Sequence, residues 1–252
     1  MRERSSFFEF GPILCASFFR CYVNDIDRPL HPNALRTIAT GLAGLLFAKA
    51  FLSILYQYRF YFPADFESDF LIVRREWFHG IYRSAFYAHI VSAPVALLAG
   101  LFLVVSGPNR RYRHLHRLAG RCLAVLVFAF VSPSGLIMAA YAPAGMFAGA
   151  GLATLDVGTA YCLIMAIRQA RLRQFRSHQR WAMRCFILLC SPLLLRLTTG
   201  FVIVMQLDPD WNDRLNPWIS WLIPLVIHEI RLHVSDLHDS TRSPVSKMEA
   251  LP

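Results

Sequence analysis

Charge is scarce in this chain, and lysine is nearly absent from it. Asp, Glu, Lys and Arg make up 17% of the residues, against about 25% in ordinary soluble domains. Hydrophobic residues reach 56%, and the mean hydropathy is +0.41. The formal net charge of +10 rests almost wholly on arginines, which cluster between apolar segments. This pattern excludes an ordinary soluble domain, argues against a nucleic-acid partner, and indicates a membrane protein whose loops lie against anionic lipid.

Several chemical signatures are also missing. None of the six cysteines forms a CxxC pair, so we interpret them as small buried apolar residues. No HExxH, GxSxG, P-loop or dinucleotide fingerprint occurs, which leaves a hydrolase or NTPase without support. The N-terminal stretch has no A-x-A cleavage site, and Glu9 and Pro12 interrupt its apolar residues. We therefore predict a cytoplasmic or interfacial segment over 1–34 rather than a signal peptide.

Six apolar runs are long enough to cross about 30 Å of hydrocarbon, which takes roughly 20 residues in a helix. They are predicted near 35–57, 85–107, 117–141, 148–170, 179–205 and 216–233. Lipid offers no partner to an unpaired backbone group, so these spans must be helical. The expected fold is all-α: a polytopic integral membrane helix bundle of about six transmembrane helices over 35–233, with a core at 85–231. A disordered cytoplasmic tail is predicted for 234–252.

The Lys and Arg residues beside the spans fix the expected orientation. With the N-terminus inside, eighteen of them flank the inner ends of the spans and five flank the outer ends. We therefore predict that both termini face the cytoplasm, in a multi-pass protein of the bacterial inner membrane.

Two predicted hairpins resemble each other. The third span opens with RLAGRC from Arg117, and the fifth opens with RWAMRC from Arg180. Both follow basic loops that contain histidine. Spans two–three and four–five are therefore a candidate internal duplication.

One polar layer is predicted in the outer half of the bilayer. At ~1.5 Å rise per residue, Lys49, Asp156 and Arg196 each lie roughly 12–13 Å deep, with His89 somewhat nearer the outer surface. These four are candidate substrate-binding residues. One interpretation is an Asp156–Arg196 ion pair that locks two helices while Lys49 extends outward. The other is a positively biased cavity for an anionic headgroup, a carboxylate or a proton relay.

A second polar layer is predicted at the inner end, roughly 6–8 Å below the surface. Its candidate cofactor-binding residues are His116, His178, His228, Arg121, Arg184 and Glu229. The three histidines could converge on a haem or a metal ion; the alternative is that they lie at the interface beside the arginines. His89 has no histidine partner in the outer half, which argues against two haems in series. We name no residue as a dedicated metal ligand.

Several segments resemble a bacterial family of multi-spanning predicted membrane proteins, known only as a domain of unknown function. HRLAGR at 116–121 and HQRWAMR at 178–184 are similar to its HRxxGR and HRRWMxR motifs. The further matching segments are His89 with SAPVALLAG, SGLIMA at 134–139, LLLR ending at Arg196 and WISWLIPLVIHE ending at Glu229. The resemblance covers about 85–231 and departs at Gln179 and Ala182. It implies a membrane protein and no established activity; its motifs are loosely similar to those of four-helix haem b proteins.

Three functions are compatible with these observations. The first is a membrane redox protein that binds haem b or a quinone at the cytoplasmic end. The second is a transporter of an anionic or lipid-like solute that uses the outer layer. The third is a non-catalytic assembly or sensing protein in which both layers are structural, with a membrane-protein partner or a second copy of the chain. The expected partner in every case is the lipid bilayer.

Overall fold

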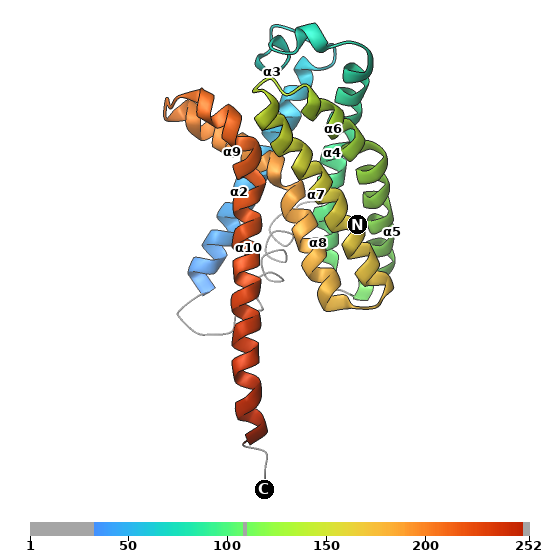
Figure 1. The fold of residues 1–252 in the computed structure, drawn as a ribbon, viewed down its shortest axis with the longest axis vertical. Helices are drawn as coiled ribbons and strands as arrows, with labels where there is room; N and C mark the ends of the chain where they lie inside the picture. The colour runs from blue at the N-terminus through green and yellow to red at the C-terminus, as the bar shows by residue number, and fades with distance from the viewer. Residues whose placement is uncertain (1–32, 108–109, 249–252) are drawn as a thin grey trace, which may run out of the picture.

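The computed structural model describes residues 33–107 and 110–248, and the regular structure of these residues is helical (Figure 1). The segment predicted to lie at the interface, 1–34, falls almost entirely outside the described residues. The elements, in chain order, are α2 Asn33–Gln57, η1 Tyr58–Phe60, α3 Asp69–Ile72, η2 Arg75–Trp77, α4 Gly80–Ser106, η3 Arg110–Tyr112, α5 Arg113–Val125, η4 Leu126–Val131, α6 Ser132–Ala140, α7 Met146–Arg171, α8 Phe175–Leu189, α9 Ser191–Val204 and α10 Pro209–Met248.

Five helical segments are long and apolar enough to cross a membrane. They are Gly41–Phe60, Gly80–Ser106, Arg113–Ala140, Met146–Arg171 and Phe175–Val204. Each overlaps one of the first five predicted spans, so the structure confirms a polytopic all-α membrane protein. The sixth predicted span, 216–233, lies inside α10, where Asn216, His228 and Glu229 lower the hydropathy of the apolar stretch.

Two of the spans are interrupted within the bilayer, each beside a proline. The span that starts with α5 passes through the π-helix η4 before it continues as α6, and Pro133 stands at the start of α6. The span formed by α8 and α9 breaks at Cys190, and Pro192 stands at the start of α9. Proline lacks a backbone N–H and clashes with the preceding turn, which accounts for both breaks. A π-helical turn frequently marks a functional position in a helix.

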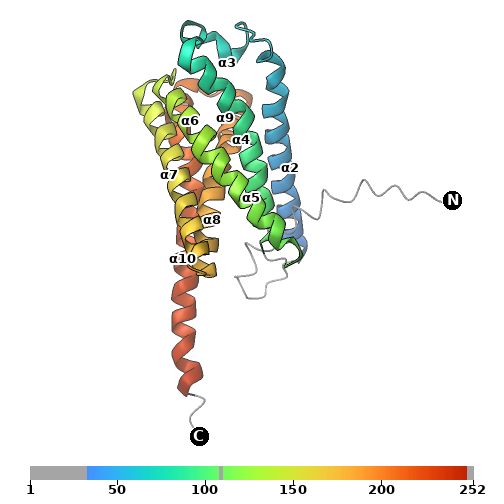
Figure 2. The same ribbon diagram turned by 90° about the vertical axis from the view of Figure 1, so that its right-hand side faces the viewer.

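The core lies between the two hairpins α4–α5 and α7–α8 (Figures 1 and 2). Phe186 of α8 is 4% exposed, and its ring lies 3.2 Å from the position a Cβ would take on Gly100 of α4. Leu97, Leu123 and Val127 pack in the same cluster. Burial of each such side chain contributes about 1.5–3 kcal/mol, so the two hairpins form one packed unit.

Residues 58–79, which join α2 to α4, form an aromatic cap at one end of the bundle. Tyr61, Leu71, Phe78 and Phe86 are buried within it. Tyr61 and Phe86 meet edge to face with ring centroids 5.2 Å apart, a favoured aromatic geometry. We call this the cap end. The opposite end, where the α4–α5 and α7–α8 connections lie, is the hairpin end.

The last helix, α10, packs along α7, α8 and α9 and continues past the hairpin end (Figure 1). Residues 234–248, predicted as the start of a disordered tail, continue this helix in the structure. An ion pair from Asp236 to α8 supports the extension, and polar composition alone gave no sign of that contact.

Candidate functional site

His116 and His178 lie at the hairpin end, and the imidazole of each contacts the helix that precedes it in the chain. His116 on α5 has its Nδ1 3.1 Å from the Ser106 hydroxyl, in the last turn of α4. His178 on α8 has its Nδ1 2.9 Å from the carbonyl oxygen of Ala166 on α7. Both imidazoles are partly buried, and each joins the two helices of one hairpin near their connection. The candidate duplication therefore has a structural counterpart in this pair of contacts.

The imidazoles of His116 and His178 lie close enough to interact electrostatically. His228, the third histidine predicted to converge with them, instead lies on α10 beside Glu229, Arg184 and Arg180. His228 is buried, with 4% of its surface exposed. Over the described ranges, no three His, Cys, Asp or Glu side chains gather where they could hold a metal ion.

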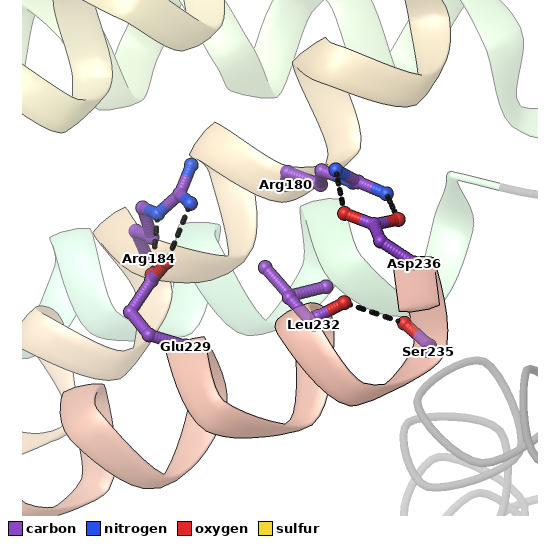
Figure 3. A network of polar contacts seen from close by, with 6 residues as sticks. All are labelled: Arg180, Arg184, Glu229, Leu232, Ser235 and Asp236. Carbon is purple, nitrogen blue, oxygen red and sulfur yellow. Dashed lines mark hydrogen bonds and ion pairs between the residues drawn. The ribbon is translucent and has the colours of Figure 1, made fainter. Parts of the chain in front are cut away.

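Two ion pairs join α8 to α10 at this end (Figure 3). Arg184 donates from Nε to Glu229 Oε1 at 2.6 Å and from Nη2 to Oε2 at 2.7 Å. Its guanidinium also lies 4.5 Å from the ring centroid of Trp181. Arg184 and Glu229, both assigned to the inner layer, thus form an ion pair in the bidentate form that arginine and carboxylate favour.

The second pair joins Arg180 to Asp236, with N–O distances of 3.0 and 2.5 Å. The Arg180 guanidinium holds the pKa of the Asp236 carboxyl below its usual value. Sequence reasoning missed Asp236, because its polar neighbours suggested a tail. The signal was present nonetheless: Glu229 and Asp236 are seven residues apart and share one helix face, as do Arg180 and Arg184 at four apart. Arg121, predicted in this layer, is exposed on α5.

Within the bilayer, Asp156 of α7 lies against the backbone of α6. A Cβ placed on Gly135 would lie 2.0 Å from Asp156 Oδ2, so only glycine admits the carboxyl here. One residue earlier, Ser134 lies 3.2 Å from His89 Nδ1, which also contacts the Val131 carbonyl oxygen at 3.2 Å. His89 of α4 and Asp156 of α7 thus lie at adjacent residues of α6, just after η4.

The other two members of the predicted outer layer lie elsewhere. Arg196 of α9 lies beside Tyr61 of the cap and acts electrostatically on Arg74. Lys49 is exposed on α2, a helix whose bundle contact is with α9. Ion pairs within 4.0 Å in the described part of the chain do not include Asp156, Lys49 or Arg196. Over these residues, no ion pair therefore joins the three charges.

Polar side chains also form hydrogen bonds between α9 and α10, which the sequence did not predict. We call these contacts the polar seam. Asn216 donates to the Leu195 carbonyl oxygen at 3.0 Å and accepts from Thr198 Oγ1 at 2.6 Å. Ser191 and Ser220 pair at 2.8 Å and are fully or almost fully buried. Asparagine and serine at helical spacing in an apolar helix gave a weak signal, because only the packing shows that they face a partner.

These observations define the class of protein: a polytopic helical membrane protein with polar groups inside its bundle and at both ends of it. Residues 86–232 match the family described as "Predicted membrane protein (DUF2306)", and the chain belongs to that family. The matched region includes His89, His116, His178 and Glu229, whereas α2 and the cap lie before it. No curated protein and no solved structure gives a match.

Proposed function

We propose that this protein is a membrane redox protein that binds haem b, or a quinone, between His116 and His178. The supporting observation is that both imidazoles are held through Nδ1. A carbonyl oxygen only accepts, so His178 Nδ1 must donate to Ala166. In the neutral ring the lone pair then belongs to Nε2, the usual ligand atom when Nδ1 is bonded in this way.

The residues present fit such a group. Helix bundles hold cofactors between inward-facing side chains, and His116 of α5 and His178 of α8 lie near enough to interact electrostatically. Arg117 and Arg121 are exposed on the same helix as His116 and would balance the charge of haem propionates. A bound haem would supply one-electron transfer. The role of Ser106 and Ala166 would be to orient the two rings.

This geometry favours the redox hypothesis over the transporter hypothesis derived from the sequence. That hypothesis relies on Lys49, Asp156 and Arg196 acting together, and no ion pair within 4.0 Å joins them over the described residues. With the N-terminus inside, the proposed site faces the cytoplasm at a bacterial inner membrane.

An absorption spectrum of the full chain purified in detergent tests the proposal. We expect a Soret band, or a quinone in the organic extract, and we expect His116→Ala and His178→Ala each to abolish binding. His114→Ala is the matched control, because His114 is exposed on the same turn of α5. A colourless protein that releases no quinone and takes up no added haemin would overturn the proposal. So would ligand binding that survives loss of both His116 and His178.

A further inference from the structure

A lone carboxyl group lies inside the bundle, where α7 packs against α6. Asp156 belongs to the middle of the span Met146–Arg171, and its carboxyl reaches the backbone of Gly135. In the described part of the chain it forms no ion pair within 4.0 Å, and no charged side chain acts on it. The facing elements, η4 and α6, contain no ionisable residue. A charged carboxylate is costly in hydrocarbon, so this group requires a cation or a proton.

The face of α6 that meets α7 also carries a buried hydroxyl. Gly135 and Ala139 both lie on this face, because a Cβ placed on Gly149 of α7 would lie 2.5 Å from the Ala139 carbonyl oxygen. Ser132 precedes Gly135 by three residues and therefore shares the same face, about one turn away. It is 8% exposed, and its Oγ has no hydrogen-bond partner among the residues that the structure describes.

The irregular turn before Ser132 explains this unpaired hydroxyl. A helical serine commonly donates to a carbonyl of the preceding turn, as Ser134 does to the Phe130 oxygen at 2.5 Å. The turn before Ser132 is π-helical, and the Ser132 backbone N–H reaches Val127, five residues back. Pro133 follows and has no N–H to donate into the same turn. The break is therefore rich in oxygen acceptors and short of donors.

A second hydroxyl comes from α7. Thr159 follows Asp156 by three residues, shares its helix face and is 4% exposed. Its hydroxyl donates to the Leu155 carbonyl oxygen at 2.8 Å, so its remaining lone pairs can only accept. Since α6 and α7 run antiparallel, Thr159 lies one turn from Asp156 in the direction of Ser132 (Figure 1). One carboxyl and two hydroxyl groups thus lie on facing surfaces of two helices.

We propose that Asp156, Ser132 and Thr159 bind one small monovalent cation, Na⁺ or H⁺, between α6 and α7. The carboxylate supplies the charge, and hard cations prefer oxygen ligands of this kind. Interrupted helices supply such ligands in other membrane proteins, where carbonyls freed by the break join the site. The site goes beyond the proposed redox function and lies away from the His116–His178 site at the hairpin end, so either can fail without the other.

Thermal unfolding of the full chain in detergent tests the site, in sodium chloride against choline chloride of equal ionic strength at alkaline pH. We expect Na⁺ to stabilise the wild type, and Asp156→Asn or Ser132→Ala to weaken the apparent Na⁺ affinity about tenfold or more. Ser132→Ala should stay folded, because it removes an unpaired buried hydroxyl. Thr154→Ala is the matched control for Thr159→Ala: both threonines donate to the carbonyl four residues back, but Thr154 is exposed.

Infrared titration of the carboxyl C=O band without Na⁺ distinguishes a proton from Na⁺. If Na⁺ changes neither stability nor this band, and the band is absent from Asp156→Asn, the site takes a proton. Ser132→Ala should then need more acid to show the band, because no serine oxygen accepts from the protonated carboxyl. A Na⁺ response that survives Asp156→Asn would overturn the proposal. So would a Na⁺ response and a titration that are both unchanged in Ser132→Ala and Thr159→Ala.

Discussion

At the scale of single residues, Asp156 of α7 lies against Gly135 of α6 and leaves no room for a side chain there. A carboxyl group inside hydrocarbon is costly and normally faces the bundle interior. Here it lies directly on the α6 backbone, at the one residue type that leaves room for it. The contact follows the η4–α6 break, so the irregular helix and the buried carboxyl share one location. Glycine at 135 is thus a steric requirement of Asp156.

Gly135→Ala tests this relation. The added methyl would lie 2.0 Å from Asp156 Oδ2, and we expect a loss of about 1–3 kcal/mol of stability, the usual cost of overpacking. Adding Asp156→Ala to Gly135→Ala should recover most of that loss, which a double-mutant cycle of thermal unfolding in detergent would measure. Gly200→Ala is the control, because nothing lies within 4 Å of a Cβ there. Equal losses at Gly135 and Gly200 would contradict the steric interpretation.

At the scale of elements, α8 and α10 are joined by two ion pairs of different strength. Arg184 and Glu229 have side chains 19% and 44% exposed, whereas Arg180 and Asp236 are 40% and 49% exposed. Water screens an exposed pair and leaves it worth little. A more buried guanidinium that loses its carboxylate keeps an uncompensated charge. The two pairs therefore differ in what their removal costs, although both are bidentate.

Glu229→Gln should destabilise the protein by about 1–2 kcal/mol, a value reduced from that of a fully buried pair because Glu229 is partly exposed. Asp236→Asn should change stability by much less. Thermal unfolding of the two purified variants in the same detergent checks the difference. If Asp236→Asn costs as much as Glu229→Gln, the exposure of the two pairs does not set their contribution.

The sequence predicted the apolar spans but not the full length of α10, and the difference has a physical reason. The five apolar spans were predictable because the length of a hydrocarbon-crossing helix and its lack of charge are properties of consecutive residues. The continuation of α10 through 234–248 was not predicted, because the contact between Asp236 and Arg180 joins residues 56 positions apart. The hydrogen bonds between α9 and α10 were not predicted for the same reason.

At the scale of the whole molecule, α10 bears on how many times the chain crosses the bilayer. It runs along α7, α8 and α9, antiparallel to the α8–α9 span (Figures 1 and 2). Although its apolar stretch is the least hydrophobic of the six predicted spans, the asparagine and serine side chains that lower its hydropathy face α9. Such groups are tolerated in a bundle when a neighbouring helix satisfies them.

We expect α10 to be a sixth crossing, which places both ends of the chain on the same side of the membrane. The distribution of arginine predicts that this is the cytoplasmic side. A fluorescent protein fused after Pro252 should therefore fluoresce, and alkaline phosphatase at the same position should be inactive. A phosphatase fused within the cap, after Glu67, should be active, since the cap lies at the other end of the spans. A phosphatase that is active both after Pro252 and within the cap would mean that α10 does not cross. A phosphatase active only after Pro252 would mean that the orientation is inverted.

Consecutive residues determined the class of this protein, its helical fold and the positions of its spans, because lipid imposes the same demand on every backbone group within it. They also supplied the residues of the candidate sites. Only the tertiary structure decided how those residues are grouped. It placed His116 near enough to His178 to interact electrostatically, His228 beside Glu229, and Arg196 beside Tyr61 of the cap. The physical reason is that depth in the bilayer follows from position along a helix, whereas the neighbour at that depth depends on helix rotation and packing.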